Sequence, residues 1–218
     1  MDEPKRGLRA AGVLRNRASI LASARRHLVE TGFHRLGLEQ VAADAGVTRA
    51  TIYRQFTNKL GLLDALAEDL AARSGLVPRM AAALATPDPA AALVAMAAEL
   101  CRFWGTDPDV FRRLIGLAAV DPEAHRVLSG REQWRYRQVA TLVTRLDAAG
   151  RLRPEINQEH AVAAIGAVTG FPACDELAAR AGLDHDRIDR LVLALLGGIV
   201  RVGCEDGGGL EGGVDEHR

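Results

Sequence analysis

The chain has 218 residues, of which 48% are hydrophobic and 26% charged, and its formal net charge at pH 7 is zero. Such a composition is typical of a globular protein. No apolar stretch of about 20 residues is present, and the charged N-terminus lacks the apolar segment of a secretory signal. The sequence therefore predicts a cytoplasmic protein that spans no membrane.

The zero net charge hides an uneven distribution along the chain. Residues 1–60 hold 11 Lys and Arg against 5 Asp and Glu, whereas residues 61–218 hold 17 against 23. A basic N-terminal part on an acidic remainder directs one end of the molecule at a polyanion such as nucleic acid.

The first 12 residues are polar and predict a disordered basic arm. Its Lys5, Arg6 and Arg9 could lie over a DNA backbone or minor groove, or the segment could be a solvated tail. An amphipathic helix is expected next, ending near Thr31-Gly32, because apolar residues recur at helical spacing at Ile20, Leu21, Ala24 and Leu28.

Two short helices joined by a tight turn are expected over residues 38–56. In 38–45 the apolar residues follow the i, i+3, i+4, i+7 pattern of one helix face, at Leu38, Val41, Ala42 and Ala45. Gly46 accepts the positive φ that such a turn requires. Thr48 can cap the following helix.

The second of these helices is too short to be stable alone. Ile52 and Phe56, four residues apart, can anchor it to its neighbours. Several of its other side chains can reach base edges or phosphates, namely Arg49, Thr51, Arg54 and Gln55. A polar short helix with apolar anchors is what a helix-turn-helix places in a DNA major groove. Asn58 can then cap a longer helix with an apolar face at Leu62, Leu63, Leu66 and Leu70.

The segment from Ile20 to Leu66 resembles the N-terminal domain of TetR-type (tetracycline-repressor-like) transcriptional regulators. The matching residues are Ile20-Leu21, Ala24, Gly32-Phe33, Val41-Ala42, Ala45-Gly46-Val47, Thr51-Ile52-Tyr53, Phe56, Asn58-Lys59 and Leu62-Leu63. Leu36-Gly37 departs from the family, which usually has hydroxyl residues at this helix start, but Gly is an acceptable cap.

The resemblance assigns roles within the N-terminal domain. Phosphate contacts fall to Thr48, Tyr53 and Lys59, and groove-facing positions to Arg49, Ala50, Thr51, Arg54 and Gln55. Arg favours guanine and Gln favours adenine, while the methyl groups of Ala and Thr can touch thymine. Arg49 and Thr51 are the main candidates for base readout. Tyr53 could instead be a packing residue, and Arg54 could contact phosphate only.

The remainder of the chain predicts helices, so the fold class is all-α with about nine or ten helices. Residues 75–88 are expected to break the helical pattern. Further helices are expected at Ala90–Trp104, Pro108–Val120, Pro122–Ala149 with a kink near Ser129-Gly130, Gln158–Arg180 with a break near Phe171-Pro172, and Asp184–Arg201. The expected domains are a helix-turn-helix domain at 13–60, a ligand-binding and dimerisation domain at 61–202 that shares a connecting helix at 58–74, and a disordered tail at 203–218.

The resemblance implies a homodimer on a pseudo-palindromic operator in double-stranded DNA. The family typically pairs its last two long helices across the two-fold axis, which suggests an interface of Ala161, Ala164, Ile165, Val168, Ile188, Leu191, Leu195 and Ile199. The alternative is that these helices only close the core of the monomer.

The resemblance also implies a small-molecule effector in a mostly apolar pocket of the helical body. Candidate lining residues are Met96, Phe103, Trp104, Phe111, Trp134 and Tyr136. A row of large apolar residues is more often plain core, so this alternative stays open. The sequence does not indicate the effector's identity.

No catalytic or metal-binding motif is present. The six histidines show no metal-ligand spacing, and Cys101, Cys174 and Cys204 are widely separated free thiols, of which Cys101 or Cys174 could sense redox state. We therefore expect neither a cofactor nor enzyme activity. The expected function is that of a repressor that a small-molecule ligand releases from DNA. The alternatives are an activator or co-repressor-dependent regulator, and a helical small-molecule-binding or catalytic protein that no longer binds DNA.

Overall fold

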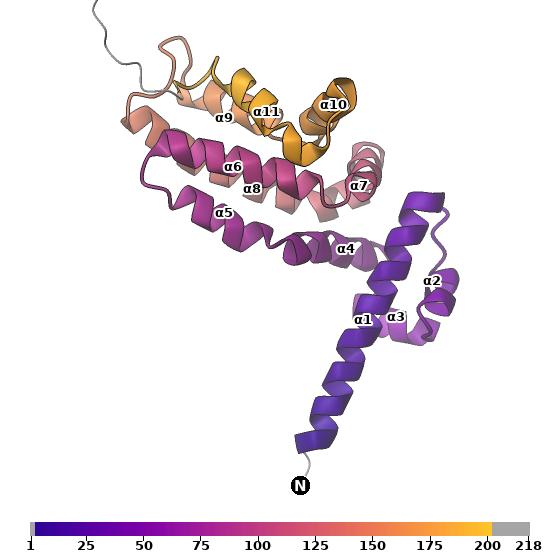
Figure 1. Cartoon of the computed structure of the whole chain (residues 1–218). Helices are drawn as coiled ribbons and strands as arrows, with labels where there is room; N and C mark the ends of the chain where they lie inside the picture. Colours follow the sequence, from indigo (N-terminus) through magenta and orange to yellow (C-terminus); the bar gives the residue numbers. More distant parts are fainter. Residues whose placement is uncertain (1–2, 202–218) are drawn as a thin grey trace, which may run out of the picture.

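The computed structural model describes the backbone of residues 3–201 and the side chains of residues 11–201. Within this part the fold is all-α, as predicted, with eleven α-helices and one 3₁₀-helix. Its only β feature is an isolated antiparallel bridge between Leu152 and Val200. The N-terminal helices form a small head, and the remaining helices form a larger layered body (Figure 1).

The head consists of α1 (Glu3–Thr31), α2 (Leu38–Asp44) and α3 (Arg49–Phe56). The backbone of α1 begins at Glu3, so residues 3–12, expected to form a disordered arm, are its first turns. The head core is a set of fully buried side chains that the sequence periodicity predicted, including Ile20, Leu28, Val41 and Ile52. Gly46 turns the chain between α2 and α3 with φ of +64°.

Helix α4 (Lys59–Ser74) leads from the head into the body, and Asn58 caps it by accepting a hydrogen bond from the Gly61 amide at 2.8 Å. A second helix, α5 (Leu76–Leu84), follows directly after Gly75. The expectation of a break over residues 75–88 was therefore wrong for most of that segment. Pro78 lies in the first turn of α5, where proline is tolerated, and Met80 packs into the core.

Three longer helices form the centre of the body, α6 (Pro89–Trp104), α7 (Pro108–Val120) and α8 (Pro122–Ala148). Each begins with a proline in its first turn, and Asp88 and Asp121 cap α6 and α8 through their carboxylates. Helix α8 continues through Ser129 and Gly130, where the sequence suggested a kink. It packs against α7 and α9.

The C-terminal layer contains α9 (Gln158–Val168), α10 (Phe171–Ala181), the 3₁₀-helix η1 (His185–Arg187) and α11 (Asp189–Leu196). The predicted break near Phe171-Pro172 is confirmed, with Pro172 in the first turn of α10. Helix α11 ends earlier than expected, because the chain after Gly197-Gly198 turns to form the bridge at Val200. The tail at 203–218 lies outside the described residues.

Among the described residues no single helix is long and apolar enough to cross a membrane, and α9 and α10 meet that criterion only as a pair bent by 50°.

Candidate nucleic-acid interface and ligand cavity

Helix α3 divides into a buried face and an exposed face, as its sequence predicted. Ile52 and Phe56 are 1% and 4% exposed and pack between α2 and α4. The exposed residues are Arg49, Ala50, Tyr53 and Arg54, together with the capping residue Thr48. Thr51 is half-buried, and its amide and hydroxyl both lie within hydrogen-bonding distance of the Thr48 hydroxyl, at 3.2 and 3.0 Å. This face offers guanidinium, hydroxyl and methyl groups at the molecular surface.

Arg49 is held by two neighbours on this surface. Its Nη1 pairs with the carboxylate of Glu39 on α2, and its Nη2 donates to the Tyr53 hydroxyl at 3.1 Å. Hydrogen bonding to Tyr53, followed by the charges of Tyr53 and Glu39, raises the pKa of Arg49. The structure thus brings together two of the predicted DNA-contacting residues with Glu39, which the sequence reasoning missed. The sequence shows both Glu39 at the start of α2 and Arg49 ten residues later, but it does not show that their side chains pair.

Two predicted contact residues, Lys59 and Gln55, are half-buried. Lys59 donates from Nζ to the His34 carbonyl at 3.2 Å and lies 4.4 Å from the Phe33 ring centre, and burial lowers the pKa of its ammonium. Only one of its three donors is engaged by this carbonyl. The Oε1 of Gln55 is buried and meets no hydrogen-bond partner within the described residues. In this conformation that oxygen faces the protein interior and cannot accept from a base edge.

The profile described as "Bacterial regulatory proteins, tetR family" matches residues 20–66, the segment that contains the core of α1, the exposed face of α3 and the start of α4. Residues 20–66 therefore form a TetR-type N-terminal domain. A search of curated proteins finds no match for it.

Solved TetR-family and other regulators share the fold over nearly the whole chain. Native NalD from Pseudomonas aeruginosa, the secondary repressor of the MexAB-OprM multidrug efflux pump, is 25% identical with a TM-score of 0.68, covering 87% of this chain and 98% of its own. The fatty acid degradation regulator FadR from Bacillus halodurans is 19% identical with a TM-score of 0.70, covering 84% of this chain and 95% of its own. A proposed transcriptional regulator from Saccharomonospora viridis, solved in complex with choline, is 18% identical with a TM-score of 0.63, covering 84% of this chain and 97% of its own.

The body contains a cavity of about 640 Å³ between α4, α5, α7, α8 and the facing ends of α6 and α10. Four of the predicted pocket residues line it, namely Phe103, Trp104, Phe111 and Trp134. Met96 and Tyr136 do not: Met96 is fully buried in the core, and Tyr136 stacks with Arg135. Phe171 also lines the cavity, and its ring centre lies 5.7 Å from that of Trp104.

The polar groups of the cavity wall are largely paired within the protein. Arg135 is 4% exposed and binds Glu132, the Gly166 carbonyl at 2.8 Å and the Thr169 hydroxyl at 3.0 Å. Trp104 donates from Nε1 to the Thr169 carbonyl at 3.0 Å. The wall consequently presents mainly aromatic and aliphatic surface to a ligand.

The cavity and the head share helix α4. Ala67 and Ala71 of α4 line the cavity, whereas Leu62 and Leu66, nearer its N-terminus, are buried in the core that α4 forms with the head. Arg131 of α8, another lining residue, pairs with the Asp64 carboxylate at 2.7 Å and donates to its carbonyl at 3.0 Å. A displacement of the cavity wall would therefore act on the helix that carries the head.

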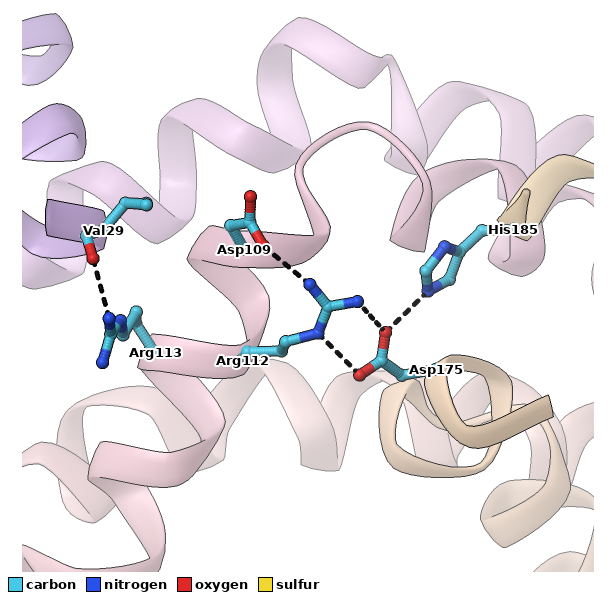
Figure 2. Close-up of polar contacts among 6 residues, drawn as sticks. All are labelled: Val29, Asp109, Arg112, Arg113, Asp175 and His185. Atoms are coloured by element: carbon cyan, nitrogen blue, oxygen red, sulfur yellow. Dashed lines mark hydrogen bonds and ion pairs between the residues drawn. The ribbon is translucent and has the colours of Figure 1, made fainter. Parts of the chain in front are cut away.

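A second set of polar contacts joins the body to α1 (Figure 2). Arg113 of α7 donates to the Val29 carbonyl near the end of α1 at 2.8 Å. Its neighbour Arg112 forms a two-pronged pair with Asp175 of α10, at 2.8 and 2.7 Å, and Asp175 also pairs with His185 at 3.1 Å. Burial would raise the pKa of Asp175, but the Arg112 guanidinium and His185 together outweigh it and lower that pKa. Helix α7 is thus fixed at both the head and the C-terminal layer.

The predicted interface residues divide into two groups. Ala161, Ile165, Ile188 and Ile199 face the monomer interior, with exposures of 8% or less, so they cannot form an outer surface. Ala164 and Val168 are half-buried, and Leu191 and Leu195 are 38% and 52% exposed. The sequence periodicity found the apolar faces of α9 and α11 but could not separate the inner residues from the outer ones.

Cys101 on α6 and Cys174 on α10 are both buried, and the Cys174 thiol donates to the Val168 carbonyl at 3.7 Å. The neighbouring Cys174 thiol, followed by burial, raises the pKa of Cys101. Cys204 lies outside the described residues. No group of three or more His, Cys, Asp or Glu side chains that could hold a metal ion occurs in the described part.

Proposed function

We propose that this protein is a dimeric, sequence-specific transcriptional repressor that leaves its operator when a small molecule occupies the cavity. The observation that carries the proposal is the double role of α4, whose C-terminal half lines the cavity while its N-terminal half packs against the head. A ligand that fits one position of α4 better than another shifts the population of head arrangements.

A single head reads only a few base pairs, so we propose a two-fold dimer. Two copies of α3 would then enter successive major grooves about 34–36 Å apart. The outward apolar residues Ala164, Val168, Leu191 and Leu195 are the proposed contact surface. The same proposal places the protein in the cytoplasm, with DNA, and assigns it no catalytic activity.

The effector is proposed to be a mostly apolar, uncharged molecule. Five aromatic residues line the cavity, and the buried guanidinium of Arg135 is already neutralised by Glu132. An ionic ligand would lose its hydration without finding a free buried partner of opposite charge, which is unfavourable. Aromatic faces instead favour a ligand with apolar rings or chains.

Selection of bound sequences from random duplex DNA by the purified protein tests the proposal. We expect enrichment of a pseudo-palindrome whose half-site centres are one helical turn apart. The selected operator then serves to screen uncharged apolar compounds for release of the protein. Ligands that strengthen binding would favour a co-repressor-dependent regulator. No enrichment at low salt, where phosphate contacts are strongest, would contradict the ligand-released repressor and leave either a co-repressor-dependent regulator or a protein whose head does not read DNA.

A further inference from the structure

Glu39, in the first turn of α2, holds the guanidinium of Arg49, the first residue of α3. The two side chains are 78% and 53% exposed. Arg49 also donates to the Tyr53 hydroxyl at 3.1 Å, and its guanidinium carbon lies 5.3 Å from the centre of the Tyr53 ring. Residues of two different helices therefore fix both terminal nitrogens of one arginine on the exposed face of the helix-turn-helix.

A need to hold α2 against α3 does not explain the carboxylate at position 39. An exposed ion pair contributes little to stability, and the α2–α3 turn already has its own contacts, including the hydrogen bond from the Val47 amide to the Ala42 carbonyl at 3.0 Å. A negative charge on a surface that approaches phosphates also weakens binding to every DNA sequence. Glu39 therefore opposes general affinity, whereas its pairing with Arg49 can act on the choice of sequence.

The pairing with Glu39 changes what Arg49 can do. The carboxylate offsets the positive charge, so the guanidinium attracts phosphate less strongly. Of its five N–H donors, the contacts with Glu39 and Tyr53 use two. The other three can still serve the O6 and N7 acceptors of a guanine. Fixing a flexible side chain before binding also reduces the entropy lost on contact.

We propose that Glu39 is a specificity-determining positioning residue, which holds Arg49 for a guanine edge and disfavours its contact with phosphate. This inference rests on the proposed DNA-binding function, because it concerns the same face of α3.

The test compares the wild type, Glu39→Ala, Arg49→Ala and the double variant, each as the full chain. Dissociation constants are measured for the selected operator and for random duplex DNA over a range of salt concentrations. We expect Glu39→Ala to lower the ratio of operator to random affinity about tenfold, with relaxed preference at one base pair of each half-site. The slope of log affinity against log salt should steepen by about one per head. In the Arg49→Ala background, Glu39→Ala should change the ratio by no more than about twofold.

The charge-matched control is Glu30→Ala, an exposed carboxylate on α1 that is not a partner of Arg49. It should strengthen binding to all sequences alike and leave the ratio unchanged. An unchanged ratio in Glu39→Ala, or the same change with and without Arg49, would overturn the role of Glu39 while leaving the DNA-binding function intact. If the wild type itself selects no sequence, the proposed function fails and the role of Glu39 fails with it.

Discussion

Thr57, between α3 and α4, has a backbone conformation that threonine rarely adopts. Its φ is +64° and ψ is −52°, and the amide of Asn58 donates to the Phe56 carbonyl across it at 2.6 Å. These features describe a γ-turn with positive φ, which is strained for a residue with a branched Cβ. The side chain is exposed. The strain belongs to the single residue that sets how the chain leaves α3 and enters α4.

Thr57→Gly is expected to raise the free energy of unfolding by about 0.5–1 kcal/mol. Relief of about 1–2 kcal/mol of backbone strain exceeds the entropy that glycine adds to the unfolded chain. Urea unfolding followed by circular dichroism measures the change. Thr57→Ala retains a Cβ at positive φ and should show no gain, so equal stabilisation by both substitutions would contradict the explanation.

At the scale of the element, α8 and α9 approach closely at Gly166. A Cβ added at this position would lie 2.2 Å from Cε1 of Tyr136. The Gly166 carbonyl also accepts from Arg135 at 2.8 Å. Alanine is normally favoured over glycine inside a helix by about 1 kcal/mol, but here the tyrosine ring occupies the space that its methyl group needs. Packing between two helices thus overrides local propensity.

Gly166→Ala is expected to destabilise the protein by about 1–3 kcal/mol, because the Tyr136 ring must leave its place beside Arg135. Gly116→Ala is the matched control, since Gly116 lies inside α7 and a Cβ there meets no atom within 4 Å. It should stabilise by up to about 1 kcal/mol. Denaturant unfolding distinguishes the two, and a Gly166→Ala cost that persists in the Tyr136→Ala background would show that the ring is not the cause.

At the scale of the whole molecule, two helices of the body, α4 and α7, contact the head directly, and a third, α8, acts on it through α4. Helix α4 runs from one to the other, and Arg131 of α8 binds α4 at Asp64. Helix α7 contributes the bond from Arg113 to the Val29 carbonyl and an ion pair between Asp107, its capping residue, and Arg25 of α1. Since α4, α7 and α8 all line the cavity, its state can influence the head by more than one route.

The dimer proposed above predicts the effect of a charge on its outer surface. Leu195→Glu should give a folded monomer that no longer binds operator, because a buried unpaired carboxylate is unfavourable at an interface whereas this side chain is 52% exposed in the single chain. Val120→Glu, at a position 75% exposed on α7, should leave the dimer intact. Light scattering and operator titration measure both properties, and a dimeric Leu195→Glu protein would exclude this face as the interface.

The sequence predicted most of the elements because their signals are local. Thr48 and Asn58 cap α3 and α4, and the apolar anchors Ile52 and Phe56 are buried as the helical periodicity indicates. Helix α5 was missed because Gly75 before it and Pro78 within it resemble a loop, although packing of Met80 against the core favours a helix. The orientation of Gln55 and the partners of Lys59 depend on neighbouring segments and were not predictable from spacing.

By itself the sequence determined the all-α class, the helix-turn-helix and the basic head, since these follow from residues only a few positions apart. Only the tertiary structure decided which apolar residues line a cavity and which face outward. Phe111 and Phe171 meet with ring centres 5.5 Å apart although 60 positions separate them, and Arg131 meets Asp64 across 67 positions. Such contacts depend on how whole helices pack, which periodicity along a single helix does not specify.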